Sequence, residues 1–278
     1  MICFPNAKIN LGLQVVSRKP DGYHNIETIF YPIPFCDALE IVLSESNETT
    51  FTQTGILVDG NIEDNIVMKA FRLLEKDFDL PRIAIYLRKQ IPLGAGLGGG
   101  SADAAFMLKL LNDFAGLGLS VEELEKYAGQ LGADCPFFIR NSPVFAEGIG
   151  NIFTPVNVSL RDNYLVLIKP DIHISTKEAY NGINPKQPTS RLTEIIRLPV
   201  KEWKNYMVND FEEGIFARYP IIREITQSLY DLGALYSSMS GSGSSVFGIF
   251  ESNKKMSIFA SEMIDIEKNR FMCKIFKI

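Results

Sequence analysis

Residues 91–103 read Ile91-Pro-Leu-Gly-Ala-Gly-Leu-Gly-Gly-Gly-Ser-Ala-Asp103, and five of these thirteen residues are glycine. Glycine tolerates positive φ and lets a ligand approach the bare backbone. The apolar spacing that follows, through Ala105, Leu108 and Leu111, predicts a helix over residues 102–114. The start of a helix offers unpaired N–H groups and the positive end of the helix dipole. The segment therefore predicts a site for an anion, most often a phosphate.

The sequence of this segment disfavours three common classes of phosphate-binding loop. Gly94-x-Gly96-x-x-Gly99 matches the dinucleotide-binding pattern, but the acidic residue required about 20 positions later would fall where another helix starts. A Walker A loop needs a Lys directly after its last glycine, and this segment has none there. The glycine loop of protein kinases joins two strands, whereas this one opens a helix. A plain tight turn is a further alternative, although turns rarely need five glycines at the start of a helix.

The composition is that of an ordinary globular chain of 278 residues, with 46% hydrophobic and 22% charged side chains. This length fits one large domain or two modest ones. The net charge is −5, whereas a general binder of nucleic acid or of an anionic membrane needs a basic surface. No apolar run approaches the roughly 18 residues of a membrane span. We therefore expect neither a nucleic-acid partner nor a membrane partner.

The cysteines and histidines do not predict a metal site formed by the protein. The four cysteines are widely scattered without a Cys-x-x-Cys pair, and the chain has only two histidines. The N-terminus lacks the basic segment and apolar stretch of a signal peptide. These patterns favour a reduced protein in the cytoplasm.

The pattern of apolar residues predicts strands and helices that alternate in both halves of the chain. Strands are expected over residues 9–16, 26–33, 39–45, 82–90, 164–169, 244–250 and 271–278. Further helices are expected over residues 64–76 with Asp64 as N-cap, after Ser120 with Glu123 completing a capping box, over residues 220–232, and over residues 254–265. The sequence thus predicts an α+β fold with two domains, residues 1–158 and 159–278.

The glycine loop resembles the central motif of the GHMP kinases, a family named for galactokinase, homoserine kinase, mevalonate kinase and phosphomevalonate kinase. Two further segments occur in the order that this family shows. The N-terminal strand motif is matched by Pro5-Asn-Ala-Lys8-Ile-Asn10-Leu11, and the C-terminal glycine motif by Ser240-Gly-Ser-Gly-Ser-Ser245. The resemblance implies the two-domain GHMP kinase fold, with the active site in the cleft between the domains.

Three more blocks resemble one branch of this family. They are Arg18-Lys-Pro-Asp-Gly-Tyr-His24, Leu131-Gly-Ala-Asp134-Cys-Pro136 and Ala146-Glu-Gly-Ile-Gly150. Members of that branch transfer a phosphoryl group from ATP, with Mg²⁺, to the 2-hydroxyl of a methylerythritol linked to cytidine diphosphate. This reaction belongs to the non-mevalonate route to isoprenoid precursors. The resemblance therefore implies ATP and Mg²⁺ as cofactors and a small cytidine diphosphate compound as substrate.

The resemblance also implies roles for particular residues. Asp134 would accept the hydroxyl proton as catalytic base, and Lys8 would keep Asp134 ionised and stabilise the transferred phosphoryl group. The residues expected to bind ATP are Pro92, Leu93, Gly94, Ala95, Gly96, Leu97, Gly98, Gly99, Gly100, Ser101 and Ala102 in the loop, with Asn65 and Lys89 beside the adenine. From the residues alone, an Asp before Cys-Pro, such as Asp134, is usually a turn or cap residue. Asn65 and Lys89 are as often structural as ligand-binding.

Four residues are expected to bind the substrate. By the resemblance, Asn10 would bind its erythritol end, and Tyr23 and His24 would recognise the cytosine by stacking and hydrogen bonds. Tyr180 would cover the second face of the base. From the residues alone, Asp21-Gly-Tyr-His24 is as often an ordinary turn as a binding segment.

Three other functions stay open at this point. A GHMP kinase for another alcohol, mevalonate or homoserine, would not need the block from Asp21 to His24. A dinucleotide-dependent oxidoreductase would use Gly94, Gly96 and Gly99. A non-catalytic relative would not need to retain Lys8 and Asp134.

Overall fold

The structure is a computed structural model that describes residues 1–46, 48–58, 60–251 and 271–278. The chain forms two compact units, each built from several stretches of sequence. Unit 1 comprises Met1–Lys8, Pro32–Leu93 and Gly98–Ser142. Unit 2 comprises Ile9–Tyr31, Gly94–Leu97 and Pro143–Ile278.

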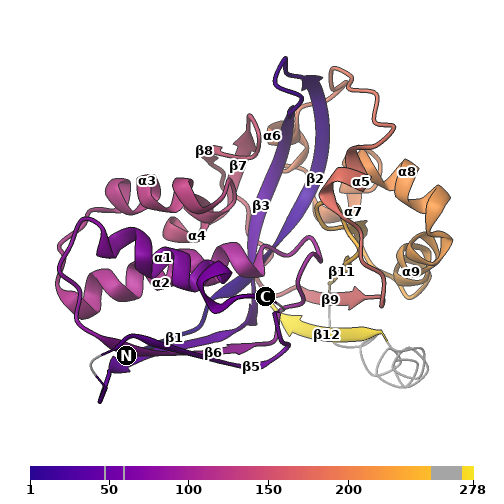
Figure 1. The fold of residues 1–278 in the computed structure, drawn as a ribbon. Coiled ribbons are helices and arrows are strands. Elements are labelled where there is room, and N and C mark those ends of the chain that lie inside the picture. Colours follow the sequence, from indigo (N-terminus) through magenta and orange to yellow (C-terminus); the bar gives the residue numbers. More distant parts are fainter. Residues whose placement is uncertain (47, 59, 252–270) are drawn as a thin grey trace. The chain divides into compact units, whose positions relative to one another are not determined.

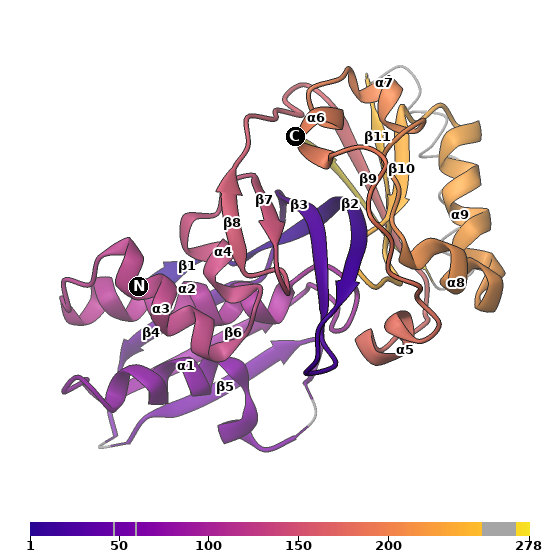
Figure 2. The ribbon, with the colours of Figure 1, turned by 90° about the horizontal axis from the view of Figure 1, so that it is seen from above.

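Unit 1 contains a four-stranded sheet with helices over one face (Figure 1 and Figure 2). Its strands, in spatial order, are β1 (Ile2–Cys3), β4 (Ala38–Leu43), β6 (Ile83–Lys89) and β5 (Thr50–Gly55). β5 runs parallel to β6, and the other neighbours are antiparallel. Along β6, Ile83, Ile85 and Leu87 are buried, whereas Tyr86 and Arg88 are exposed. This alternation gives the sheet one face in the core and one polar face.

The described residues of unit 1 form one 3₁₀ turn and four α-helices. They are the 3₁₀ turn η1 (Ile62–Asp64) and the helices α1 (Ile66–Glu75), α2 (Gly99–Ala115), α3 (Val121–Leu131) and α4 (Cys135–Arg140). α1 and α2 pack against each other over the sheet (Figure 1). The capping box between Ser120 and Glu123 is present at the start of α3, as predicted.

Two predicted helix starts were wrong. Asp64 lies in the 3₁₀ turn η1, and Asn65 is the N-cap of α1, because its side chain accepts a hydrogen bond from the Val67 amide. α2 begins at Gly99, three residues before the predicted start at Ala102. The low helix propensity of glycine places Gly99 and Gly100 in the loop, but tertiary packing outweighs propensity, and both residues belong to α2.

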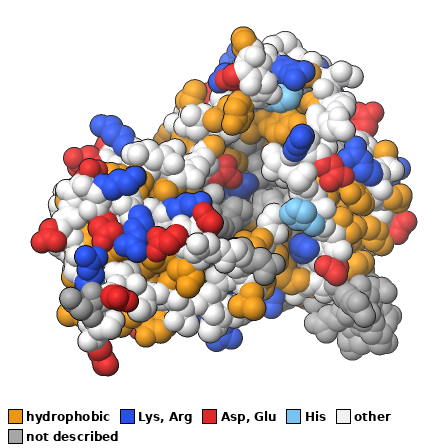
Figure 3. Space-filling model, viewed as in Figure 1, with side chains coloured by type: hydrophobic (Ala, Val, Ile, Leu, Met, Phe, Trp, Pro, Cys, Tyr) orange, Lys and Arg blue, Asp and Glu red, His pale blue; other side chains and the backbone are white. Residues whose placement is uncertain are grey.

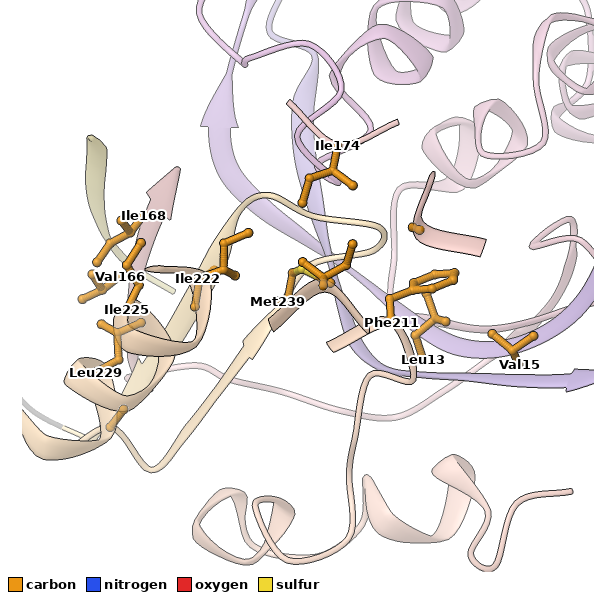
Figure 4. Close-up of a cluster of buried hydrophobic side chains, with 14 of the residues drawn as sticks. Leu13, Val15, Val166, Ile168, Ile174, Phe211, Ile222, Ile225, Leu229 and Met239 are labelled. Atoms are coloured by element: carbon orange, nitrogen blue, oxygen red, sulfur yellow. The ribbon is translucent and has the colours of Figure 1, made fainter. Parts of the chain in front are cut away.

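Unit 2 contains a second four-stranded sheet, which is antiparallel throughout. Its strands, in spatial order, are β10 (Tyr236–Met239), β11 (Val246–Phe250), β9 (Tyr164–Lys169) and β12 (Met272–Lys277). α8 (Phe211–Arg218) precedes α9 (Pro220–Asp231), and α9 packs on β10 and β11. Ile222, Ile225 and Leu229 from α9 lie in one apolar cluster with Val166 and Ile168 from β9 (Figure 4).

A third sheet is formed by long and short strands in the order β2 (Asn6–Arg18), β3 (His24–Cys36), β7 (Val144–Glu147) and β8 (Ile152–Pro155). The division between the units passes along β2, after Lys8, and along β3, after Tyr31. Within unit 2, Leu13 and Val15 from β2 join the apolar cluster of α9 (Figure 4). Ile26 from β3 belongs to the same cluster. Three short helices complete the described elements: α5 (Thr176–Tyr180), α6 (Leu192–Ile195) and α7 (Val200–Trp203).

The elements confirm the α+β fold class. The strand expected over residues 164–169 is β9, and Pro220 opens α9 as predicted. The helix expected over residues 254–265 lies outside the described residues. The domain boundary expected between residues 158 and 159 stays a prediction, and the compact units divide the chain at other points.

The surface of unit 1 carries charges of both signs, which are interspersed over its helices on the left of Figure 3. Arg140 pairs with Glu122 and Glu125, and Arg72 pairs with Glu63 and Glu75, among other ion pairs. Among the described helices, none combines the length and the apolar character that crossing a bilayer requires.

Candidate active site

The glycine loop holds a backbone that requires glycine at two of its positions. Gly96 has φ of +75° and Gly98 has φ of +70°, both in the left-handed region. Within unit 2, a Cβ atom on Gly96 would lie 1.9 Å from the carbonyl oxygen of Ser240. Within unit 1, a Cβ atom on Gly98 would lie 2.9 Å from Phe138 and 3.2 Å from Lys8. A side chain at either position would therefore strain the backbone and displace its neighbours.

The start of α2 has the properties of an anion site. Gly98 is its N-cap, and among the described residues no side chain makes the capping hydrogen bond. The first turn of α2 contains no acidic residue. The first N–H groups of the helix and the positive end of its dipole are therefore available to a phosphate.

Lys8 and Asp134 form an ion pair in unit 1, with 3.6 Å between Lys8 Nζ and Asp134 Oδ2. The Lys8 side chain is 5% exposed, whereas the Asp134 side chain is 34% exposed. Burial lowers the pKa of Lys8, and the charge of Asp134 opposes this shift. Because Gly98 lies against the stem of Lys8, the pair sits beside the start of α2. Unit 1 thus combines an accessible carboxylate, an enclosed cation and an anion site.

Asn65 lies on the wall of a cavity of about 200 Å³ in unit 1. The cavity is lined by Phe51, Gln53, Leu57, Val58, Gly60, Asn61, Ile62, Asp64 and Asn65. The Asn65 side chain accepts from the Val67 amide at 2.9 Å and donates to Gln53 Oε1 at 3.3 Å. Apolar walls with a few fixed amide groups suit a flat heteroaromatic ring.

In unit 2, the second glycine segment holds the middle of the glycine loop. Ser240 Oγ donates to the Gly96 carbonyl oxygen at 2.8 Å, and the backbone N–H of Asn10 donates to Ser240 Oγ at 3.2 Å. Asn209 Nδ2 donates to the carbonyl oxygens of Met239 at 2.9 Å and Gly241 at 2.8 Å. The two glycine segments are therefore in direct contact within unit 2.

His24 and Tyr180 are stacked in unit 2, with 4.6 Å between ring centroids and 14° between ring planes. At this separation the rings touch, so a third ring would stack on an outer face or displace one of them. Burial lowers the pKa of His24, and the charge of Arg18 adds to the shift. The neighbouring Tyr23 ring is 63% exposed and available for a ligand. The structure thus brings together two of the four residues predicted to bind substrate.

Two family models match successive parts of the chain. The family model described as "GHMP kinases N terminal domain" matches residues 65–142, and the one described as "GHMP kinases C terminal" matches residues 192–265. The chain belongs to the GHMP kinase family.

Curated relatives of this GHMP kinase are similar over nearly their whole length. A protein of Parabacteroides distasonis named 4-diphosphocytidyl-2-C-methyl-D-erythritol kinase is 62% identical over 94% of this chain and 96% of its own length. A protein of Bacteroides fragilis with the same name is 58% identical over 92% of this chain and 94% of its own. The family and the fold predicted from the sequence are confirmed.

Solved structures show the same fold. A crystal structure titled 4-(cytidine 5'-diphospho)-2C-methyl-D-erythritol kinase has a TM-score of 0.82 and 28% identity, over 99% of this chain and 98% of that one. Homoserine kinase from Cytophaga hutchinsonii has a TM-score of 0.65 at 20% identity, over 98% and 93% of the two chains. The second likeness concerns the fold alone.

The structure of this GHMP kinase places two predicted residues deeper than expected. Asn10 is 2% exposed, and its side-chain amide donates to Thr28 Oγ1 at 2.9 Å. Lys89 is 1% exposed and forms ion pairs with Asp37 and Asp103. Sequence analysis missed these two partners of Lys89, although the phase of β6 gives a signal. Lys89 lies two residues after Leu87, on the buried face of the strand, where a lysine needs counter-charges.

Proposed function

We propose that this chain is an ATP-dependent kinase that phosphorylates the 2-hydroxyl of 4-diphosphocytidyl-2-C-methyl-D-erythritol, in the non-mevalonate route to isoprenoid precursors. The observation that carries the proposal is the Lys8–Asp134 pair beside the uncapped start of α2. The curated relatives bearing this name, which are 58% and 62% identical over most of the chain, support the choice of acceptor.

The transfer itself requires few groups. Asp134 accepts the proton of the 2-hydroxyl, and that oxygen forms a bond to the γ-phosphorus of ATP. The bond between the γ-phosphorus and the β–γ bridging oxygen breaks, and ADP leaves. Lys8 stabilises the charge on the transferred group, and its low exposure strengthens this interaction relative to one in water.

The nucleotide site in this proposal is built around α2. The loop residues Pro92 to Ala102, including Ser101, form the phosphate site, in which the first backbone N–H groups of α2 bind the phosphates. Asn65 borders the adenine in the cavity of unit 1. Lys89 completes the site from beneath the helix start, since its ammonium lies against Gly99. Mg²⁺ enters with ATP as part of the substrate, bound by phosphate oxygens.

The acceptor site in this proposal uses residues of unit 2. Tyr23, His24 and Tyr180 recognise the cytosine by stacking and by hydrogen bonds. The exposed Tyr23 ring and the stacked pair of His24 and Tyr180 supply the aromatic faces. Asn10 orients the erythritol end of the substrate.

The proposal also includes a domain boundary and a compartment. The N-terminal family match ends at residue 142 and the C-terminal match begins at residue 192. The boundary between the two domains lies in the stretch between these matches, between residues 158 and 159. The enzyme acts in the cytoplasm, where ATP and its Mg²⁺ complex are supplied.

The proposal is tested by incubating the purified chain with MgATP and each of three alcohols. These are 4-diphosphocytidyl-2-C-methyl-D-erythritol, mevalonate and homoserine, with the product followed by ³¹P NMR. We expect a new phosphomonoester signal with the cytidine compound alone. A signal with mevalonate or homoserine instead would overturn the acceptor while keeping the kinase. A folded protein that binds no ATP would overturn the kinase as well.

A further inference from the structure

Three buried charged side chains lie directly beneath the glycine loop, all within unit 1. Asp37, Lys89 and Asp103 are 1%, 1% and 2% exposed. Lys89 Nζ contacts Asp37 Oδ2 and lies 3.1 Å from Asp103 Oδ2. The proposed chemistry assigns no task to Asp37 or Asp103. Because burying charges is costly, a cluster of three calls for an explanation.

The cluster contacts the chain on both sides of the loop. At the loop entrance, Asp37 Oδ1 accepts hydrogen bonds from the amides of Gln90 at 2.5 Å and Ile91 at 2.9 Å. At the loop exit, Asp103 belongs to the second turn of α2. Lys89 bridges the two carboxylates and so ties the entrance to the exit.

The cluster also lies against the first residue of α2. A Cβ atom on Gly99 would be 2.9 Å from Lys89 Nζ and 2.7 Å from Ile91 Cγ2. The ammonium therefore occupies the space that a side chain at the start of the helix would take. Movement of Lys89 would change the position of the N–H groups that face the phosphate.

The charges of the cluster do not balance if both carboxylates are ionised, because two acids share one ammonium. Burial raises the pKa of Asp103; the ammonium of Lys89 opposes this shift, and the Asp37 carboxylate adds to it. Among the described residues, Asp103 Oδ1 is buried without a hydrogen-bond partner. With the Asp103 carboxyl protonated, one carboxylate and one ammonium remain, and the cluster is neutral.

We propose that Asp37, Lys89 and Asp103 form a clamp that fixes both ends of the glycine loop and thereby positions the N–H groups that hold the phosphates of ATP. The three are positioning residues, since they act through the loop and through Gly99. The proposal rests on ATP as the phosphoryl donor and is independent of the identity of the acceptor.

The charge count makes a specific prediction about variants. In Asp37→Asn, the side-chain oxygen still accepts from Gln90 and Ile91, and Asp103 balances Lys89. In Asp103→Asn, Asp37 balances Lys89. Each single variant therefore retains a neutral pair and should bind MgATP within threefold of the wild type. The double variant leaves the ammonium buried without a counter-charge, so we expect it to weaken MgATP binding at least tenfold.

The experiment measures MgATP affinity by calorimetry without any acceptor, and adenosine affinity by ligand-observed NMR. Adenosine lacks phosphates, so a clamp on the phosphate loop should leave its affinity within twofold in all variants. The matched control is Glu40→Gln with Asp113→Asn, which likewise replaces two acids of unit 1 by amides, here at exposed positions. We expect this control to bind both ligands as the wild type does.

A further variant keeps the test decisive if the double variant does not fold. Asp37→Asn, Lys89→Met and Asp103→Leu together remove every charge of the cluster while keeping its volume, a change that buried ion clusters often tolerate. We expect this triple variant to fold and to bind MgATP at least fivefold more weakly, with a smaller loss of affinity for adenosine.

Three results would overturn the clamp. In the first, the double or the triple variant binds MgATP with the affinity of the wild type. In the second, each single variant loses as much MgATP affinity as the double variant. In the third, a variant loses affinity for MgATP and for adenosine by the same factor. A wild-type protein that binds no MgATP would instead overturn the proposed function, so the two failures are distinguishable.

Discussion

Asp134 is the residue on which the proposed proton transfer depends. Asp134→Asn keeps the size of the side chain but removes the base, so kcat should fall by about 10² to 10⁴, the usual contribution of a general base. The KM for ATP should change less than threefold, because the start of α2 is untouched. Steady-state kinetics with both substrates varied would measure this. Turnover near that of the wild type would remove Asp134 as the base.

His24 is expected to contribute binding of the acceptor and not the chemistry. His24→Ala removes one ring of the pair with Tyr180, whose centroids are 4.6 Å apart. An aromatic contact to the base is worth about 0.5 to 1.5 kcal/mol, so the KM for the cytidine substrate should rise about two- to tenfold. The KM for ATP serves as the internal control and should stay constant. An unchanged KM for the cytidine substrate would contradict the assignment of His24 to the base.

Single residues were predicted from the sequence where a motif surrounds them. Lys8 and Asp134 lie in separate motifs, yet the structure places them 3.6 Å apart. Asp64 and Asn65 show the limit of local reasoning, since both are good N-caps and only the conformation of the preceding 3₁₀ turn decides between them. Asp37 and Asp103 have no motif, and their role depends on long-range packing against Lys89.

At the scale of elements, the junction between the glycine loop and α2 has a sharp steric requirement. Gly98→Val places a β-branched side chain at φ of +70°, with its Cβ 2.9 Å from Phe138. The variant should lose MgATP binding by at least a hundredfold, because the first N–H groups of α2 would move. Calorimetric titration would measure this, with Gly116→Val as the control. Gly116 also has a positive φ but shows no heavy atom within 4 Å of its Cβ position among the described residues. Retained ATP affinity in Gly98→Val would place the phosphates elsewhere.

The start of α8 carries a carboxylate that should make stability depend on pH. Burial raises the pKa of Glu212 to about 7, although hydrogen bonds from the Met239 amide and Ser238 Oγ oppose the shift. The pKa in the unfolded chain is about 4.3, so the folded state binds the proton more tightly. The free energy of unfolding should therefore fall as pH rises from about 4.3 to about 7, and the loss is complete above that range.

Glu212→Gln tests this linkage, because both hydrogen bonds go to Oε1 and an amide oxygen can accept them. At pH 8 the variant should be more stable than the wild type by about 1 to 2 kcal/mol, a figure reduced because the side chain is only partly buried. The difference should shrink steadily toward pH 5 in denaturant titrations. A difference that is constant with pH would show that Glu212 does not titrate as described.

The sequence predicted the helices and strands whose apolar residues recur at a regular spacing. It did not predict the elements that form because they pair or pack with distant parts of the chain. β9 and the start of α9 follow directly from an apolar run and from Pro220. β5 was missed because its six residues, Thr-Phe-Thr-Gln-Thr-Gly, are largely exposed, and their parallel pairing with β6 gives no local signal. Short helices such as α6 and α7 have four residues each and depend on packing.

At the scale of the whole molecule, the fold does not determine the alcohol that is phosphorylated. Homoserine kinase and mevalonate kinase structures align over 98% and 99% of this chain at 20% and 14% identity. The choice of acceptor must therefore come from local blocks such as the one from Asp21 to His24. This is why sequence motifs predicted a substrate that the architecture alone leaves open.

Several segments of the chain belong to both compact units, and this sharing should determine how the molecule unfolds. β2 and β3 each contribute residues to both units, and the glycine loop changes unit after Leu93 and again after Leu97. Unfolding of β2, β3 or the glycine loop in one unit would therefore also disrupt the residues that the same segment contributes to the other unit. We therefore expect a single calorimetric transition, even though the chain has two compact units.

MgATP should move this entire transition, although its proposed contacts are largely in unit 1. A ligand at 100 times its Kd stabilises the folded state by about 2.7 kcal/mol, and for a chain of this size that corresponds to a rise in Tm of about 5 °C. Asp134→Asn should keep the shift because it retains the phosphate site, whereas Gly98→Val should lose it. Two separate transitions, of which MgATP moves only one, would mean that the shared strands do not couple the units. In that case ATP would stabilise one part of the chain without protecting the part that carries His24 and Tyr180.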